Sequence, residues 1–165
     1  MPAILRMRSL AVLPLVLVTV LFASMFVTTP SASAMSQSQR IGNALDVVRH
    51  QKGDPYRYGS AGPTAFDCSG LVYYSFRKAG FTNFPRTSSA QAAQMRRIKR
   101  SSMRKGDFLF FYNGSARASN VYHVGVFVGW DRNRRVIIHA PSTGSRVSKS
   151  KLWTDAWFPG TVRNR

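Results

Sequence analysis

One cysteine and two of the three histidines of this 165-residue chain have types and positions that suit nucleophilic catalysis. Cys68 is the only cysteine, which excludes an intramolecular disulfide and any zinc site built from several thiolates. A thiolate nucleophile needs a nearby base, and the base needs a third group that holds it in place. His123 and His139 are the candidates for these two roles, because each lies at one end of a short apolar run typical of a strand.

The position of Cys68 along the chain favours a chemical role. Residues 67–70 (DCSG) separate a loop rich in glycine and proline, 54–65, from an apolar stretch with helical spacing. We therefore expect Cys68 in the first turn of a helix over 68–78, with Asp67 as its N-cap. The free N–H groups and the helix dipole at that place lower a cysteine pKa and can stabilise an oxyanion. The alternative is a small buried thiol without chemistry.

His123 and His139 flank a predicted turn at 130–133, each eight residues from Asp131. A hairpin centred on Asp131 would place the two histidines directly opposite each other, with Cβ atoms about 4.5–5.5 Å apart. A register change of one residue would put them on opposite faces of the sheet. The pairing of the two histidines is therefore conditional on the register of this hairpin. The third histidine, His50, is expected to be solvated near the end of the first helix.

The elements that must position these residues follow from hydrophobic spacing and turn residues. Helices come first along the chain and strands second, which predicts an α+β domain with a mainly antiparallel sheet. No internal repeat is visible. The spacing predicts helical structure over 41–53, 68–78 and, in part, 87–97, and strands over 107–112, 123–129 and 136–140, with 146–147 and 157–162 as a last pair.

The first 34 residues resemble a secretory signal peptide. Arg6 and Arg8 precede an apolar run over 10–27, and Ala32-Ser33-Ala34 matches an A-x-A cleavage pattern. A retained membrane anchor is the alternative, because the run approaches spanning length. The expected organisation is a signal peptide (1–34), a short spacer (35–40) and one catalytic domain (41–165). We expect a secreted or wall-associated protein, or a periplasmic one if the source has an outer membrane, with no stable membrane span after cleavage.

The charge of the chain predicts anionic partners. It carries 24 Lys and Arg against six acids, all of them Asp, for a net charge of +18. At 44% hydrophobic residues it is not a disordered polyelectrolyte. An exported chain meets anionic wall polymers rather than nucleic acid, and no stacking motif for nucleic acid is present. A non-catalytic cationic domain that binds wall polymers or nucleic acid is a competing hypothesis, supported by the basic segment 96–105.

Five segments, in order along the chain, resemble the NlpC/P60 family of cell-wall cysteine peptidases. The resemblance covers about residues 41–162, and the FDCSGLV core followed by two histidine strands is its most specific part. Tyr58 departs from it, because the family more often has Trp there, and we expect a packing aromatic at this position. The segments are DPYRYGSAGPTAFDCSGLVYY (54–74), PRTSSAQ (85–91), KGDFLFFY (105–112), HVGVFVG (123–129) and IIHAPSTG (137–144).

The resemblance implies a papain-like fold, with the cysteine helix packed against an antiparallel sheet. It implies Cys68 as nucleophile, His123 as general base and acid, and His139 as the orienting third residue. Tyr56, Asp67 and Ser69 are then expected at the oxyanion or substrate-binding part of the site. The implied substrate is a peptidoglycan stem peptide, commonly cut between γ-D-Glu and a diamino acid.

The implied mechanism is a thiolate–imidazolium pair of Cys68 and His123 that attacks an amide and forms a thioester. No metal or cofactor is implied, and a monomer is expected. Two alternatives stay open. An amidase or acyltransferase on the same scaffold would share the chemistry, and a Cys-His-His metal site would use the same three side chains.

Overall fold

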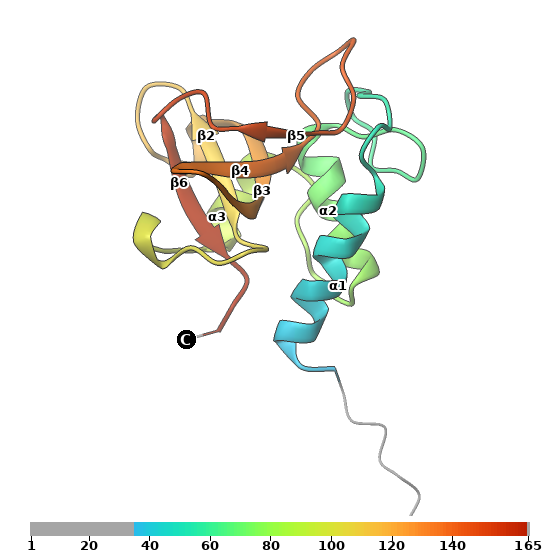
Figure 1. The fold of residues 1–165 in the computed structure, drawn as a ribbon, viewed down its shortest axis with the longest axis horizontal. Helices are drawn as coiled ribbons and strands as arrows, with labels where there is room; N and C mark the ends of the chain where they lie inside the picture. Colours follow the sequence, from blue (N-terminus) through green and yellow to red (C-terminus); the bar gives the residue numbers. More distant parts are fainter. Residues whose placement is uncertain (1–34, 165) are drawn as a thin grey trace, which may run out of the picture. The chain divides into compact units, whose positions relative to one another are not determined.

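The computed structural model describes residues 35–164, so the predicted signal peptide lies outside the described residues. The three helices precede all the strands of the sheet in the described sequence, and Figure 1 shows their arrangement. No helix in the described range is both long and apolar enough to cross a bilayer. The helices are α1 (Gln37–His50), α2 (Cys68–Lys78) and α3 (Ser88–Gln94), with 3-10 turns η1 (Arg100–Ser102) and η2 (Ala118–Asn120), and the strands are β1 (Arg96–Arg97), β2 (Phe108–Tyr112), β3 (Val121–Asp131), β4 (Arg134–His139), β5 (Ser148–Lys151) and β6 (Trp157–Thr161).

The strands form one antiparallel sheet in the order β1-β6-β2-β3-β4-β5, which confirms the α+β prediction. Side chains alternate between the two faces of β2. Phe108 and Phe110 pack into the main core with the helices, and the Phe108 ring lies 4.8 Å from that of Phe76 on α2. Leu109 and Phe111 lie in a second apolar cluster on the other face. Both faces of the central strands are therefore buried, as their nearly continuous apolar sequences require.

Helix α2 has the predicted bounds and the predicted cap. The Asp67 side chain accepts a hydrogen bond of 2.6 Å from the Gly70 amide, so the helix begins at Cys68. Glycine is required at position 70, because a Cβ there would lie 2.0 Å from the Ser60 carbonyl oxygen. The loop over 54–65 can therefore lie directly against the first turn of the helix that carries the cysteine.

Helix α1 begins earlier than the sequence predicts. Ser36 and Gln39 form a capping box, which starts the helix at Gln37. The Gln37 side chain also donates a 2.7 Å hydrogen bond to the Val162 carbonyl, near the other end of the described chain. The last four residues of the expected spacer over 35–40 therefore form the first helical turn.

The β3–β4 hairpin differs from the expected register in an informative way. Asp131 pairs with Arg134, so the turn holds only two residues, whereas Phe127 pairs with Ile137 beyond a bulge. A two-residue turn without the bulge would put His123 and His139 on opposite faces, since side-chain direction alternates along a strand. The bulge adds one residue and returns them to the same face. The expected direct opposition is nevertheless wrong: the histidines are diagonal neighbours, because the register is shifted.

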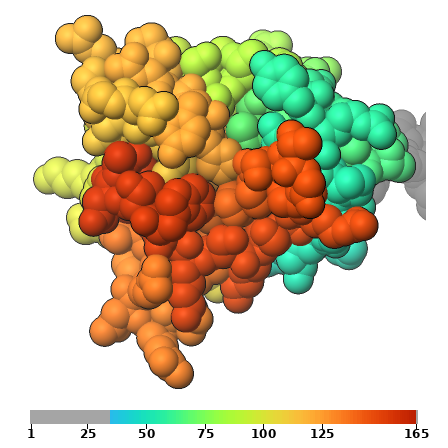
Figure 2. Space-filling view, turned by 90° about the horizontal axis from the view of Figure 1, so that it is seen from above, coloured from blue at the N-terminus to red at the C-terminus, as the bar shows by residue number. Residues whose placement is uncertain are grey.

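The connection between β4 and β5, residues 140–147, lies against the loop that leads to helix α2. The backbone N–H of Gly53 donates to the Val147 carbonyl (2.9 Å), and the backbone N–H of Tyr56 donates to the Ser145 carbonyl (2.9 Å). Figure 2 shows these two parts of the chain side by side on the face seen from above. The end of β4, where His139 lies, is thus tied to the loop that carries Tyr56.

Candidate active site

Cys68 borders a cleft of about 430 Å³ that is also lined by Tyr56, Tyr58, Arg86 and Tyr122. Burial raises the pKa of the Cys68 thiol, and the Asp67 charge raises it further. The amides of Val124 and Ser69 lower it, by less in total. The expected low cysteine pKa is therefore wrong for the free protein, because burial outweighs the effect of the helix N-terminus.

His123 and His139 form a buried hydrogen-bonded pair. The distance between His123 Nε2 and His139 Nδ1 is 2.8 Å, and His139 Nε2 lies 3.0 Å from the Ser150 hydroxyl on β5. The Trp153 ring stacks on His139 at 5.2 Å between centroids. Burial, and then the neighbouring His139, lower the pKa of His123 to about 3, and burial lowers the pKa of His139 to about 4. Both rings are therefore neutral at pH 7.

The cysteine and the histidine pair meet through strand β3. The backbone N–H of Val124, the residue after His123, is close enough to the Cys68 sulfur to lower the pKa of its thiol. Tyr122, the residue before His123, borders the same cleft as Cys68. The first turn of α2 thus reaches β3 beside His123, whose ring pairs with His139, although neither histidine lines the cleft itself.

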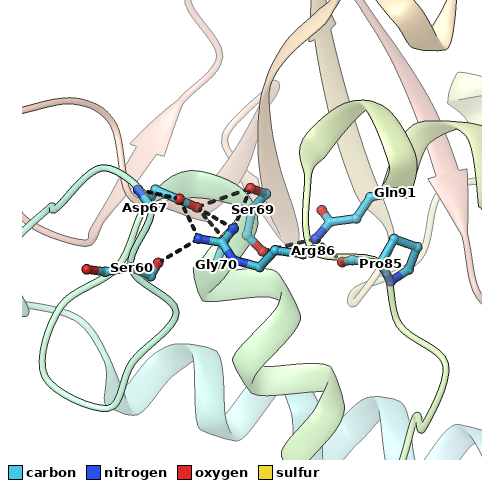
Figure 3. A network of polar contacts seen from close by, with 8 residues as sticks. Ser60, Asp67, Ser69, Gly70, Pro85, Arg86 and Gln91 are labelled. Carbon is cyan, nitrogen blue, oxygen red and sulfur yellow. Dashed lines mark hydrogen bonds and ion pairs between the residues drawn. The ribbon is translucent and has the colours of Figure 1, made fainter.

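Asp67 and Arg86 form an ion pair at the start of α2, as Figure 3 shows. Arg86 contacts both carboxylate oxygens, at 3.0 and 2.6 Å, and also donates to the Ser69 hydroxyl at 3.0 Å. Burial alone would raise the pKa of Asp67, but the hydrogen bonds from Arg86 and Gly70 outweigh it and lower that pKa. Asp67 and Ser69 border the cleft, but the Asp67 carboxylate and the Ser69 hydroxyl already form hydrogen bonds within the protein. These two side chains therefore stabilise the start of α2.

The two tyrosines of the loop differ in exposure. Tyr56 is half-buried at the cleft, and burial, followed by the charges of Cys68 and Asp67, raises the pKa of its hydroxyl. Its phenol is therefore a neutral hydrogen-bond donor at the cleft that Cys68 borders. Tyr58, expected to be a packing aromatic, is 87% exposed on the cleft rim. That expectation is wrong, because the loop turns this side chain toward solvent.

The model of the NlpC/P60 family matches residues 53–165, most of the chain. The chain belongs to the NlpC/P60 family. It is 34% identical over 126 residues to a "Probable endopeptidase" of Corynebacterium glutamicum, which covers 76% of this chain and 55% of that protein. It is 35% identical over 117 residues to the murein DD-endopeptidase MepH of Escherichia coli, with 69% and 41% covered. The chain spans about half the length of these curated relatives.

Solved structures share the fold of this NlpC/P60 domain. The P60 domain of an antigen from M. avium subspecies paratuberculosis superposes with a TM-score of 0.64 at 26% identity, covering 78% of this chain and 98% of that one. RipD of Mycobacterium tuberculosis superposes with a TM-score of 0.62, covering 76% and 98%. At 20% identity, the likeness to RipD shows the fold alone.

Sequence reasoning gave no role to several polar residues of this NlpC/P60 site. The Gln91 side chain is fully buried and donates to the carbonyls of Ser69 (3.0 Å) and Pro85 (2.9 Å). Arg86 and Gln91 both lie in the segment PRTSSAQ, which carries the resemblance but names no partner for either side chain. Ser150 lies in a short polar strand without any such signal. Each was missed because its partner is distant in sequence.

Other sequence expectations concern groups outside the cleft. His50 is exposed, and its Nδ1 lies 2.7 Å from the Asp46 carbonyl oxygen within α1, as expected for a residue outside the site. Within residues 35–164, no three His, Cys, Asp or Glu side chains converge as metal ligands do.

Replacing Arg86 by alanine should lower the free energy of unfolding by about 3 kcal/mol, because it leaves the Asp67 carboxylate buried and unpaired. Arg49→Ala is the matched control, since its pair with Asp46 is exposed on both sides and such pairs contribute under about 1 kcal/mol. Urea denaturation of both variants at neutral pH measures the difference. Equal losses would contradict a structural role for the buried pair.

Proposed function

We propose that this domain is a cysteine endopeptidase that hydrolyses amide bonds in peptidoglycan stem peptides. Cys68 is the nucleophile, His123 the general base and acid, and His139 the residue that orients His123. The observation that carries the proposal is the 2.8 Å contact between His123 Nε2 and His139 Nδ1 on the strand whose Val124 amide reaches the Cys68 sulfur. Such a nucleophile–base–orienter arrangement is the shared feature of catalytic triads.

The hydrogen bonds of the two rings favour one pair of tautomers. His123 uses Nε2 toward His139, so Nδ1 is the nitrogen left to accept the thiol proton. Nε2 must then carry a hydrogen and donate it to His139 Nδ1. His139 in turn carries its hydrogen on Nε2 and donates it to the Ser150 hydroxyl. Ser150 thus completes a chain that keeps His123 ready to act as a base.

The reaction starts from neutral groups rather than from a resting ion pair. Burial raises the pKa of the Cys68 thiol and lowers that of His123, so both directions oppose the expected thiolate–imidazolium pair in the free protein. Proton transfer from sulfur to His123 therefore accompanies attack on the amide carbonyl. The C–N bond then breaks, His123 returns the proton to the leaving amine, and a thioester remains. Water, deprotonated by His123, releases the acyl group.

The developing oxyanion has donors at hand. The first-turn amides of α2 point out of the helix N-terminus, and the Tyr56 hydroxyl lies at the same cleft. Donors of this kind typically contribute about 10²–10³-fold to the rate. Tyr56 is therefore assigned to the oxyanion or to the substrate backbone.

The proposed bond lies between γ-D-Glu and the diamino acid of the stem, in a protein exported to the wall. The names of the Corynebacterium and Escherichia relatives support an endopeptidase, and the second name specifies murein. Mass spectrometry of peptidoglycan digested with wild type identifies the new termini, and digestion with Cys68→Ala is the control. New termini that point to an amidase, or products that carry a transferred acyl group, would redirect the assignment to those reactions.

A non-catalytic role in wall binding is the second candidate. RipD is described as a non-catalytic NlpC/p60 domain protein adapted to peptidoglycan binding, so the fold also serves binding alone. The cationic surface of this chain fits that role as well. Binding of walls by wild type without any release of peptide fragments would favour this candidate.

His139→Ala should slow hydrolysis by about 10–100-fold rather than abolish it, because it removes an orienting group but leaves nucleophile and base. His139→Asn, which can still accept a hydrogen bond, should recover part of the loss. Rates on a soluble stem peptide measure both variants. His50→Ala is the control, since His50 lies outside the cleft. A wild-type rate in His139→Ala would remove this residue from the triad.

A further inference from the structure

The basic segment 96–105 has six cations and no acid among its ten residues. It lies beside the end of β6 nearest the C-terminus, yellow-green to yellow in Figure 1. Four of its cations line a groove of about 580 Å³, and Arg163 completes the set. This basic groove, defined by Arg96, Arg97, Lys99, Arg104 and Arg163, shares no lining residue with the cleft at Cys68.

The positive charge of the basic groove is not neutralised by the protein. Its one lining acid, Asp107, is 1% exposed and already bonded to Arg163, Thr161 and the backbone N–H of Arg104. Within residues 35–164, the other four cations form no ion pair. Five cations and one carboxylate leave a net charge of +4. Such crowding destabilises a free protein through self-repulsion, and a bound anion removes that cost.

Two of the guanidinium groups are held in place with donors to spare. The Arg97 guanidinium lies 4.1 Å from the centre of the Phe158 ring and donates from Nη1 to the Ala116 carbonyl at 2.9 Å. Arg96 donates from Nη2 to the Arg163 carbonyl at 3.3 Å. A guanidinium has five N–H donors, so most of them stay free. Groups that are already oriented lose less entropy when a ligand binds.

We propose that the basic groove binds a linear polymer that carries phosphate diesters and no bases. Arginine forks match the oxygens of a phosphate in pairs, and several cations along one groove suit a repeating anion. Single-stranded nucleic acid also needs aromatic side chains on which its bases stack. None of the exposed large aromatics among residues 35–164 lines the groove; these are Tyr58, Tyr122, Trp130 and Trp153. The choice of a phosphate polymer of the wall rests on the proposed function.

The test uses the full chain and a charge-reversal pair, Lys99→Glu/Arg104→Glu. Both side chains are exposed, so the substitutions remove groove charge without opening the core. Lys52→Glu/Arg117→Glu is the matched control, because it makes the same charge change at exposed positions outside the groove. Fluorescence anisotropy measures Kd for labelled poly(glycerol phosphate). We expect about tenfold or greater weakening in the groove variant, less than about threefold in the control, and a shallower salt dependence only in the former.

Competition with other polymers identifies the chemistry that is recognised. Oligo(dT) and poly-glutamate should each displace the labelled probe at least about tenfold less well than unlabelled poly(glycerol phosphate). Equal weakening in the two variants would overturn the proposal, since net charge alone would then explain binding. Stronger competition by oligo(dT) would assign the groove to nucleic acid, and equal competition by poly-glutamate would remove the preference for phosphate.

Hydrolysis of a soluble stem peptide separates this proposal from the proposed function. Both charge-reversal variants should cleave the peptide at the wild-type rate, because neither touches the cleft. If wild type binds poly(glycerol phosphate) through the groove but cleaves no peptide, the catalytic proposal fails and the groove stands. If wild type cleaves the peptide but the groove variant binds poly(glycerol phosphate) as tightly as wild type does, the groove proposal fails and the catalytic proposal stands.

Discussion

Cys68→Ala protein should hydrolyse a stem peptide at least about 10⁴-fold more slowly than wild type, because no other group of the chain can form the thioester. Cys68 is the only thiol, so no second cysteine can substitute for it. His123→Ala should lose a similar factor, since the neutral thiol then has no base. Initial rates with a defined peptide, followed by chromatography, measure both losses.

Stability measurements distinguish lost chemistry from lost folding. Cys68→Ala removes one sulfur from a partly exposed position, so its urea midpoint should stay close to that of wild type. Cys68→Ser should also stay folded and keep less than about one part in 10³ of the activity, because a neutral hydroxyl is a far weaker nucleophile than sulfur. A wild-type rate in folded Cys68→Ala would assign the hydrolysis to other residues.

The free energy of unfolding should decrease steeply as the pH falls from about 6.5 to about 4. The unfolded chain protonates its histidines near their ordinary pKa of 6.5, whereas in the folded protein burial keeps His123 neutral down to about 3 and His139 down to about 4. The unfolded state therefore binds more protons in this window, and stability is fully present only above it. Two such groups give a slope of up to about 2.7 kcal/mol per pH unit. Urea titrations at a series of pH values measure it.

The shifted pKa values of Asp67 and Cys68 act outside this window. The lowered pKa of Asp67 reduces stability only below its ordinary value of 3.8, and the raised pKa of the Cys68 thiol acts above 9.0. His139→Gln, which cannot titrate, should cut the slope to about half. A flat profile between about pH 4.5 and 6.5 would show that the paired rings do accept protons in the folded state.

Structural features that depend on neighbouring residues could be predicted from the sequence. Helix α2 and its Asp67 cap follow from adjacent residues, so they match the structure to the residue. The hairpin register did not follow, because the two-residue turn and the bulge each shift it and their effects partly cancel. Gly129, with a φ of 131° beside the bulge, is a local sign of it, but a glycine in a strand does not say how many residues are added.

Long-range partners explain most of what sequence reasoning missed at the site. Arg86 reaches Asp67 across 19 positions and His139 reaches Ser150 across 11, and neither spacing has a periodic signature. The prediction of a low cysteine pKa failed although its cause is local in the sequence. The helix N-terminus is visible in the sequence and lowers this pKa, but the burial that raises it appears only once the sheet covers the thiol.

Because Cys68 is the single thiol and borders the cleft, chemical labelling of this thiol can report on the cleft directly. A thiol-selective alkylating reagent has Cys68 as its single target, so the amount bound counts intact sites in a preparation without an added tag. A fluorophore attached there lies beside Tyr56 and Tyr122, at the place where a substrate would enter. Loss of labelling when a peptide is present would then report occupancy of the cleft directly, whether or not the bond is cut.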